Sequence, residues 1–132
     1  MLFEGRTRLV ELLAAREDPL GTADVAIAEL DQADKLEALD AHPAIGARSG
    51  LSARSAAEQG ADADPVILTE LAYLNQVYEE KFGFRFVVFV DGRPKTEILE
   101  VLCARLERTR DEELETALGE LVAIARDRWE RS

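Results

Sequence analysis

His42 is the only histidine in this chain of 132 residues, and it stands directly before Pro43. Proline disfavours helical geometry at the residue before it, so a helix that arrives through residues 35–39 is expected to end at or before His42. An unperturbed imidazole has a pKa of about 6.5, and helix carbonyls favour its charged form, so His42 is a candidate proton carrier near neutral pH. The alternative is a simple helix stop with a solvated side chain.

Arg128 is a second candidate, because it falls on the apolar stripe of a predicted C-terminal helix. Thr109 and Glu112 have the spacing of a capping box at the start of that helix. At a period of 3.6 residues, Arg128 follows the apolar residues Leu114, Leu118, Leu121 and Ala125. An inward guanidinium needs an anionic or hydrogen-bonding partner. The alternative is a side chain that reaches solvent near the chain terminus.

Ser55, Glu58 and Gln59 are polar side chains in a segment, residues 44–63, that is rich in Gly, Ser, Ala and Arg. This composition predicts mostly loop, with at most a turn or two of helix around residues 55–60. The spacing of Ser55 and Glu58 is also that of a helix capping box, and the spacing alone favours capping over substrate contact.

The charge and the cysteine count exclude several classes of partner. A net charge of −11 repels phosphate backbones, and no stripe of Lys and Arg interleaved with aromatic residues offsets it, so we expect no nucleic-acid partner. Cys103 is the sole cysteine, which excludes an internal disulfide, and one His with one Cys cannot build a common zinc site. No loop has the spacing of a calcium site, so we expect no metal.

The length and hydropathy predict one domain over residues 1–132, with enough chain to bury a substantial core. No apolar run approaches the roughly 20 residues that a membrane span needs, and the N-terminal residues lack an apolar run of signal-peptide length. We therefore expect no membrane association and a cytoplasmic location.

Capping residues and helical periodicity predict an all-α, single-domain helical bundle of about five to seven helices. Asp64 and Pro65 open the clearest of these helices, and Gly83 follows its end. In the helix after Pro94, Cys103 is expected to be a small buried hydrophobe. The predicted helices span residues 7–16, 22–42 as one helix or two, 65–82, 94–106 and 110–129.

One short extended segment, Phe84–Val90, interrupts this helical pattern. Its residues are aromatic and β-branched, which favours a strand that ends at the turn of Asp91 and Gly92. No partner strand is evident in the sequence. Its backbone groups are therefore expected to bond side chains, waters or a ligand.

Taken together, these segments resemble a known family. The series formed by H-P-A-I-G at 42–46, S-A-A-E-Q at 55–59 and residues 74–88 is similar to the 2-oxo-4-hydroxy-4-carboxy-5-ureidoimidazoline (OHCU) decarboxylases of urate breakdown. Residues 92–93, 97–99, 105–106 and 124–128 extend the similarity, which covers roughly residues 39–129. One departure is that the common H-P-D-L-G is here H-P-A-I-G, so a carboxylate expected after Pro43 is absent.

The resemblance implies an all-helical, often dimeric protein that needs no cofactor and acts on a small-molecule ureidoimidazoline. By matching of motifs, it implies two catalytic residues, His42 and Glu58. It also implies substrate contacts from Arg128 and from the backbone of the extended segment. The full set of implied substrate-binding residues is Pro43, Ser55, Gln59, Phe86, Val87, Val88 and Arg128.

The implied reaction is decarboxylation of OHCU to (S)-allantoin. Loss of CO2 leaves an electron pair on carbon, and the ring C=N beside the carboxylated carbon accepts that pair, so the substrate carries its own electron sink. Protonation of the neighbouring carbon, with conversion of the hydroxyl to a carbonyl, then gives allantoin. Two alternatives stay open at this point: a catalytically silent helical interaction module, and a relative that acts on a different ureide.

Overall fold

The computed structural model describes residues 3–43 and 64–131, and over these residues the protein is all-α, as predicted. Six helices account for the described secondary structure, and an extended segment joins the fourth to the fifth. The helices are α1 (Arg8–Ala14), α2 (Ala23–Glu29), α3 (Gln32–Asp40), α5 (Pro65–Phe82), α6 (Lys95–Arg105) and α7 (Arg110–Arg131).

Local sequence signals set the ends of the two longest helices. The Asp64 carboxylate accepts a hydrogen bond from the Val66 N–H at 2.9 Å, and Pro65 occupies the first turn of α5. The helix ends at Gly83, whose φ of 82° is the left-handed conformation that glycine adopts without strain. Before α7, Thr109 and Glu112 form the predicted capping box, since each side chain accepts from the other's N–H at 3.3 and 3.1 Å.

The region before His42 forms two helices, which resolves the question that the sequence left open. Asp31 caps α3, because its carboxylate accepts from the Asp34 N–H at 2.8 Å. Thr22 is a residue type that can cap a helix and it precedes α2, but its side chain does not cap this helix. The Thr22 hydroxyl instead donates to the Asp18 carbonyl at 2.7 Å.

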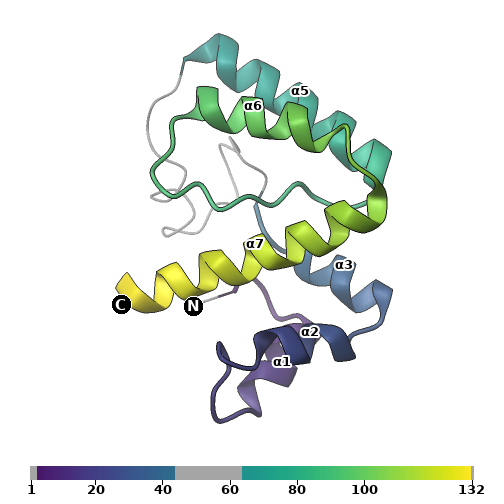
Figure 1. Ribbon diagram of the computed structural model, residues 1–132, viewed down its shortest axis with the longest axis vertical. Helices are drawn as coiled ribbons and strands as arrows, with labels where there is room; N and C mark the ends of the chain where they lie inside the picture. The colour runs from purple at the N-terminus through teal and green to yellow at the C-terminus, as the bar shows by residue number, and fades with distance from the viewer. Residues whose placement is uncertain (1–2, 44–63, 132) are drawn as a thin grey trace.

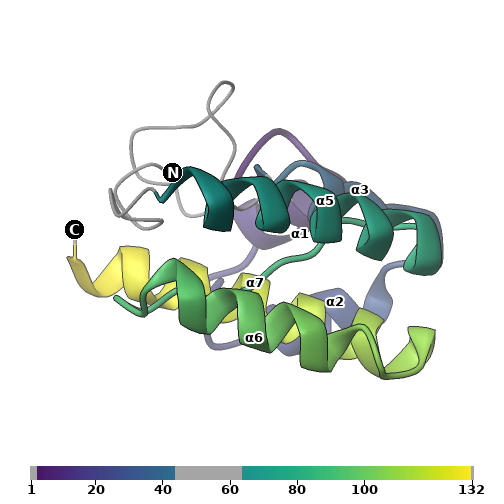
Figure 2. The same ribbon diagram turned by 90° about the horizontal axis from the view of Figure 1, so that it is seen from above.

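Helix α7 lies across the middle of the molecule, between the α5–α6 pair on one side and the group of α1, α2 and α3 on the other (Figure 1). Turning the molecule shows α5 and α6 on opposite sides of the chain that connects them (Figure 2). The extended segment of that connection passes between α6 and α7 in Figure 1, where Phe84, Phe86, Val87, Val88 and Val90 are all buried. The segment is therefore part of the core.

The buried stripe of α6 differs from the prediction. Its buried positions are Lys95, Ile98, Leu102 and Arg105, whereas Cys103 is exposed. The prediction of a buried Cys103 is therefore wrong. Each helical residue turns about 100° from the previous one, so burial of Leu102 and Arg105 carries Cys103 away from the core.

None of the helices in the described part of the chain combines the length and the apolar character that a membrane span requires.

Candidate functional site

His42 follows the end of α3, as the proline after it predicted, but its imidazole is packed into the protein. The residue is 8% exposed, which contradicts the alternative of a solvated side chain at a helix stop. Arg85 fixes this turn from the extended segment, because its guanidinium donates to the His42 carbonyl at 2.8 Å and its backbone N–H donates to the Asp40 carboxylate at 3.1 Å. The backbone around His42 is therefore held against the start of the extended segment.

The surroundings of His42 also change its titration. Burial and the positive charges of Arg128 and Arg85 together lower the pKa of the imidazole to about 4, with burial the largest cause, and the carboxylate of Glu4 opposes them. The expectation of proton exchange near neutral pH is thus wrong for the unliganded protein. At neutral pH the ring is uncharged, so it can accept a proton or a hydrogen bond at one nitrogen.

Arg128 points into the protein, as the helical stripe predicted. It is 2% exposed, which excludes the alternative of a side chain that reaches solvent. Its Nη2 lies 3.1 Å from Oε1 of Glu4, whose side chain is 11% exposed. The charges of both residues act on His42. A cation, an anion and a neutral imidazole therefore share one buried region of an otherwise acidic protein.

Glu4 belongs to the segment before α1, and its neighbours explain why it reaches the site. Phe3 is buried in the core, so the chain is anchored on one side of Glu4. On the other side Gly5 adopts a φ of 75° and passes close to α3, where an added Cβ would lie 3.1 Å from the Ala41 Cβ. The sequence reasoning missed Glu4, because it precedes the first helix and has no periodic pattern to place it.

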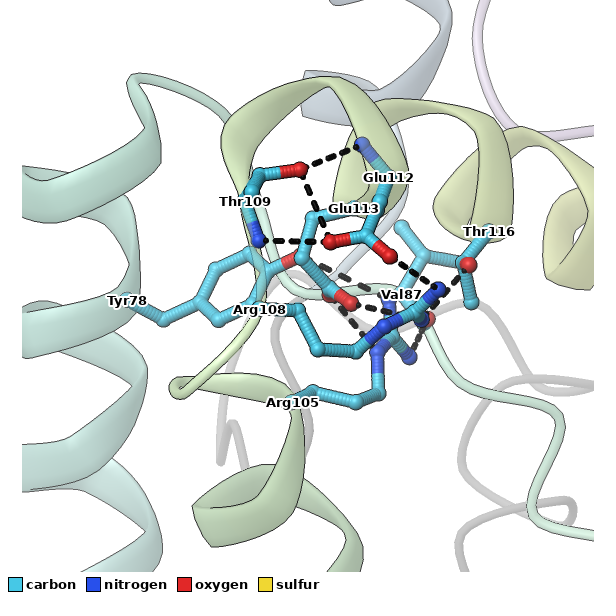
Figure 3. Close-up of polar contacts among 8 residues, drawn as sticks. All are labelled: Tyr78, Val87, Arg105, Arg108, Thr109, Glu112, Glu113 and Thr116. Atoms are coloured by element: carbon cyan, nitrogen blue, oxygen red, sulfur yellow. Dashed lines mark hydrogen bonds and ion pairs between the residues drawn. The ribbon is translucent and has the colours of Figure 1, made fainter.

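The predicted substrate-contacting residues Phe86, Val87 and Val88 are buried in the extended segment. Arginines bind three of its carbonyl groups, those of Val87, Phe89 and Val90. Arg105 donates to the Val87 carbonyl at 2.7 Å (Figure 3), and Arg93 donates to the Phe89 carbonyl at 2.5 Å. No hydrogen bond within the described residues engages the backbone groups of Phe86 or Val88, so these groups can bond a ligand.

Of the predicted site residues, the structure therefore places His42 and Arg128 in one charged region and Pro43, half-buried, beside it. Ser55, Glu58 and Gln59 lie outside the described residues, as does Ala44, and their roles stay predictions.

Arg85 was missed as a site residue. A lone charge within an aromatic and β-branched run was the available signal for it. Within residues 3–43 and 64–131, no group of three or more His, Cys, Asp or Glu side chains could hold a metal ion.

Comparison with known proteins gives one consistent family. The family described as OHCU decarboxylase matches residues 2–130. The uric acid degradation bifunctional protein TTL of Arabidopsis thaliana is 35% identical over 121 residues, which cover 85% of this chain and 37% of the relative. The 2-oxo-4-hydroxy-4-carboxy-5-ureidoimidazoline decarboxylase of Halalkalicoccus jeotgali is 34% identical over 108 residues, which cover 79% of this chain and 61% of the relative.

A solved structure supports the fold. The crystal structure of an OHCU decarboxylase in the presence of (S)-allantoin superposes with a TM-score of 0.77 at 28% identity, covering 91% of this chain and 86% of that one. By contrast, the chain spans only 37% and 61% of the length of the two curated relatives named above.

Proposed function

Since this chain belongs to the OHCU decarboxylase family, we propose that it removes CO2 from 2-oxo-4-hydroxy-4-carboxy-5-ureidoimidazoline and yields (S)-allantoin. The observation that carries the proposal is the burial of an uncharged His42 beside the cation of Arg128. A carboxylated substrate needs a cation to bind it in a protein of net charge −11, and its hydroxyl needs a proton acceptor.

In the proposed mechanism Arg128 binds the substrate through its planar fork of N–H groups, and it exchanges part of its interaction with Glu4 for the ligand. The C–C bond to the carboxylate breaks, CO2 leaves, and the electron pair moves into the adjacent ring C=N. The ring nitrogen that receives the pair takes up a proton from solvent. The neutral imidazole of His42 accepts the hydroxyl proton as that oxygen becomes a carbonyl, and one proton is delivered to the neighbouring carbon, so the net uptake is one proton. Atoms and electrons balance without a cofactor or metal.

The remaining predicted residues complete the proposed site. Glu58 and Gln59 bond the ureido and ring N–H groups and Ser55 contacts the substrate, with Pro43 forming part of the wall. The backbone groups of Phe86 and Val88 that bond no described residue suit the polar edge of an imidazoline ring, which supports the role proposed for the 86–88 run.

The test generates the unstable ureidoimidazoline in situ from urate with the upstream enzymes and follows the appearance of (S)-allantoin by its optical activity. We expect the protein to accelerate this step well above the spontaneous rate. No acceleration at micromolar protein would contradict the proposal and would favour the catalytically silent helical module. Acceleration only with another ureide would support a relative with a changed substrate.

We further propose that the chain works in the cytoplasm as a homodimer, as members of the family often do. Light scattering tests the dimer. Because Cys103 is exposed, a reducing agent must be present during the measurement, so that a disulfide between two copies is not counted as an association interface. A monomer mass at micromolar concentration would contradict the dimer and leave the catalytic proposal unaffected.

A further inference from the structure

Three polar side chains from three different helices meet in the core. They are Tyr78 of α5, Arg105 of α6 and Glu113 of α7 (Figure 3). Their exposed fractions are 0%, 6% and 0%. The Glu113 carboxylate accepts from the Tyr78 hydroxyl at 2.5 Å and from Nε of Arg105 at 2.7 Å. A buried carboxylate and a buried guanidinium are costly unless they are paired and bonded in this way.

Arg105 also bonds outside this cluster. Its Nη1 donates to the Val87 carbonyl at 2.7 Å, and its guanidinium carbon lies 4.6 Å from the centre of the Phe86 ring. The same side chain therefore holds two consecutive residues of the extended segment, one by its backbone and one by its ring. Glu113 and Tyr78 fix the orientation of the guanidinium that makes both contacts.

These contacts determine which way the extended segment presents its backbone. Successive carbonyl groups of an extended chain point to opposite sides, so a fixed Val87 carbonyl turns the groups of Phe86 and Val88 the other way. Within the described residues no hydrogen bond engages the backbone groups of Phe86 or Val88.

We propose that Arg105 is a positioning residue of the active site, which holds the Val87 carbonyl so that the backbone groups of Phe86 and Val88 face the substrate ring. The inference rests on the proposed decarboxylase function. Arg105 does not touch the reacting atoms in this account; it acts through the extended segment. Arginine is required because a planar fork can bridge a carboxylate and a carbonyl at fixed angles, whereas the lysine ammonium is a point charge on a flexible stem.

The other view of the cluster is that it only joins three helices, and the chain offers a matched control for that view. Arg108 also pairs with Glu113, with its Nη1 3.0 Å from the second carboxylate oxygen, and it donates to the Thr116 hydroxyl at 2.8 Å. It makes no hydrogen bond to the extended segment. Arg108→Lys therefore disturbs the same carboxylate without releasing Val87.

The experiment compares Arg105→Lys with Arg108→Lys at a temperature well below both thermal midpoints. It measures the dissociation constant for (S)-allantoin, kcat and KM for the decarboxylation, and hydrogen exchange of the amides of residues 86–88. For Arg105→Lys we expect about tenfold weaker allantoin binding and a raised KM, because the charge-assisted hydrogen bond to the Val87 carbonyl has been lost. Exchange at these buried amides should be faster, because the segment then opens to solvent more often. Arg108→Lys should match the wild type in all three measurements.

Equal allantoin affinity and equal amide exchange in the two variants would overturn the inference. If Arg105→Lys does not fold, Tyr78→Phe replaces it, because that change removes only a hydroxyl that bonds Arg105 itself, accepting from its Nη2 at 3.4 Å, as well as Glu113. We expect it to weaken allantoin binding about threefold, and wild-type affinity would overturn the inference. If the wild-type protein neither binds allantoin nor decarboxylates the ureidoimidazoline, the proposed function is contradicted instead. Amide exchange would then still test whether Arg105 holds the extended segment.

Discussion

Glu4 and Arg128 lie 124 positions apart in the sequence, yet Oε1 of Glu4 and Nη2 of Arg128 are 3.1 Å apart in the folded protein. The contact joins the segment before the first helix to the last helix, and the charges of both side chains act on His42. A carboxylate from one end of the chain thus already engages the cation that we propose for the substrate. Binding of an anionic ligand at Arg128 must compete with Glu4.

Arg128→Lys tests whether this cation recognises the ligand. A lysine keeps the charge opposite Glu4 but loses the planar fork. We expect turnover and (S)-allantoin affinity to fall at least about tenfold, with the free energy of unfolding changed by no more than about 1 kcal/mol. Enzyme kinetics, calorimetric titration with allantoin and the thermal midpoint measure the three quantities.

Arg126→Lys is the matched control for that change, because Arg126 lies two residues earlier on the same helix and is exposed. It should leave turnover, ligand affinity and midpoint unchanged. Wild-type allantoin affinity in Arg128→Lys would remove Arg128 from the site. A large loss of midpoint with unchanged affinity would identify the contact with Glu4 as a structural ion pair alone.

His42→Asn removes the proposed proton acceptor and keeps a polar side chain of moderate size. We expect a folded protein whose turnover falls about 10²-fold or more, the usual scale for loss of a general acid or base. Circular dichroism and the thermal midpoint at pH 7 serve as controls for folding. Near-wild-type turnover in a folded variant would exclude His42 from the mechanism.

The lowered pKa of His42 predicts how stability depends on pH. The ring has a pKa of about 4 in the folded protein and about 6.5 when unfolded, so between these values the unfolded chain binds the additional proton. Stability is therefore fully present above pH 6.5 and falls as the pH drops from 6.5 to 4, by about 3 kcal/mol in total. Denaturant unfolding across this range measures the loss.

His42→Asn should lack this part of the pH dependence, since asparagine does not titrate there. The chain has one histidine, so its imidazole proton resonance can be followed directly by NMR. A titration midpoint near pH 6.5 would contradict the lowering of the His42 pKa by burial. If the neutral ring is the proton acceptor, kcat/KM should stay constant as the pH falls from 7 to 5 and then decline near 4.

The decarboxylation should survive chelation. The substrate carries its own electron sink, and the single histidine and single cysteine cannot form a common zinc site. We expect EDTA to leave turnover unchanged, and the purified protein to show no absorption above the band of its aromatic residues. Loss of activity with EDTA that Mg²⁺ or Zn²⁺ restores would contradict this expectation.

Much of the fold could be predicted because its signals are local. Asp64, Pro65 and Gly83 each act on the backbone within one helical turn, so the bounds of α5 follow from sequence alone. Arg128 could be placed inside for a similar reason, since one period of 3.6 residues links it to the residues before it. His42 could be placed at a helix end, but not in a buried site, because its burial depends on chain segments remote in sequence.

The buried polar network was missed although its periodicity was present. Glu113 stands four and eight residues before the buried Ala117 and Leu121, and Arg105 stands three after Leu102, so both lie on buried stripes. Acidic residues are also favoured at a helix N-terminus, and Glu113 lies in the first turn of α7. This local preference explains its position well enough that its buried contacts with other helices could not be inferred. Of the charged residues that lie on an apolar stripe, only Arg128 was predicted to face the core.

The extended segment has a consequence for the unfolded protein. Residues 84–90 form a seven-residue run of aromatic and β-branched side chains with one charge, Arg85, and no proline, which is the composition of a segment that assembles into cross-β aggregates. In the native state most of its side chains are buried and arginines bind several of its carbonyls, so it cannot pair with another copy. Heating the protein above its thermal midpoint of unfolding exposes this segment. We therefore expect the fraction of the native circular dichroism signal that returns on cooling to fall as the protein concentration rises.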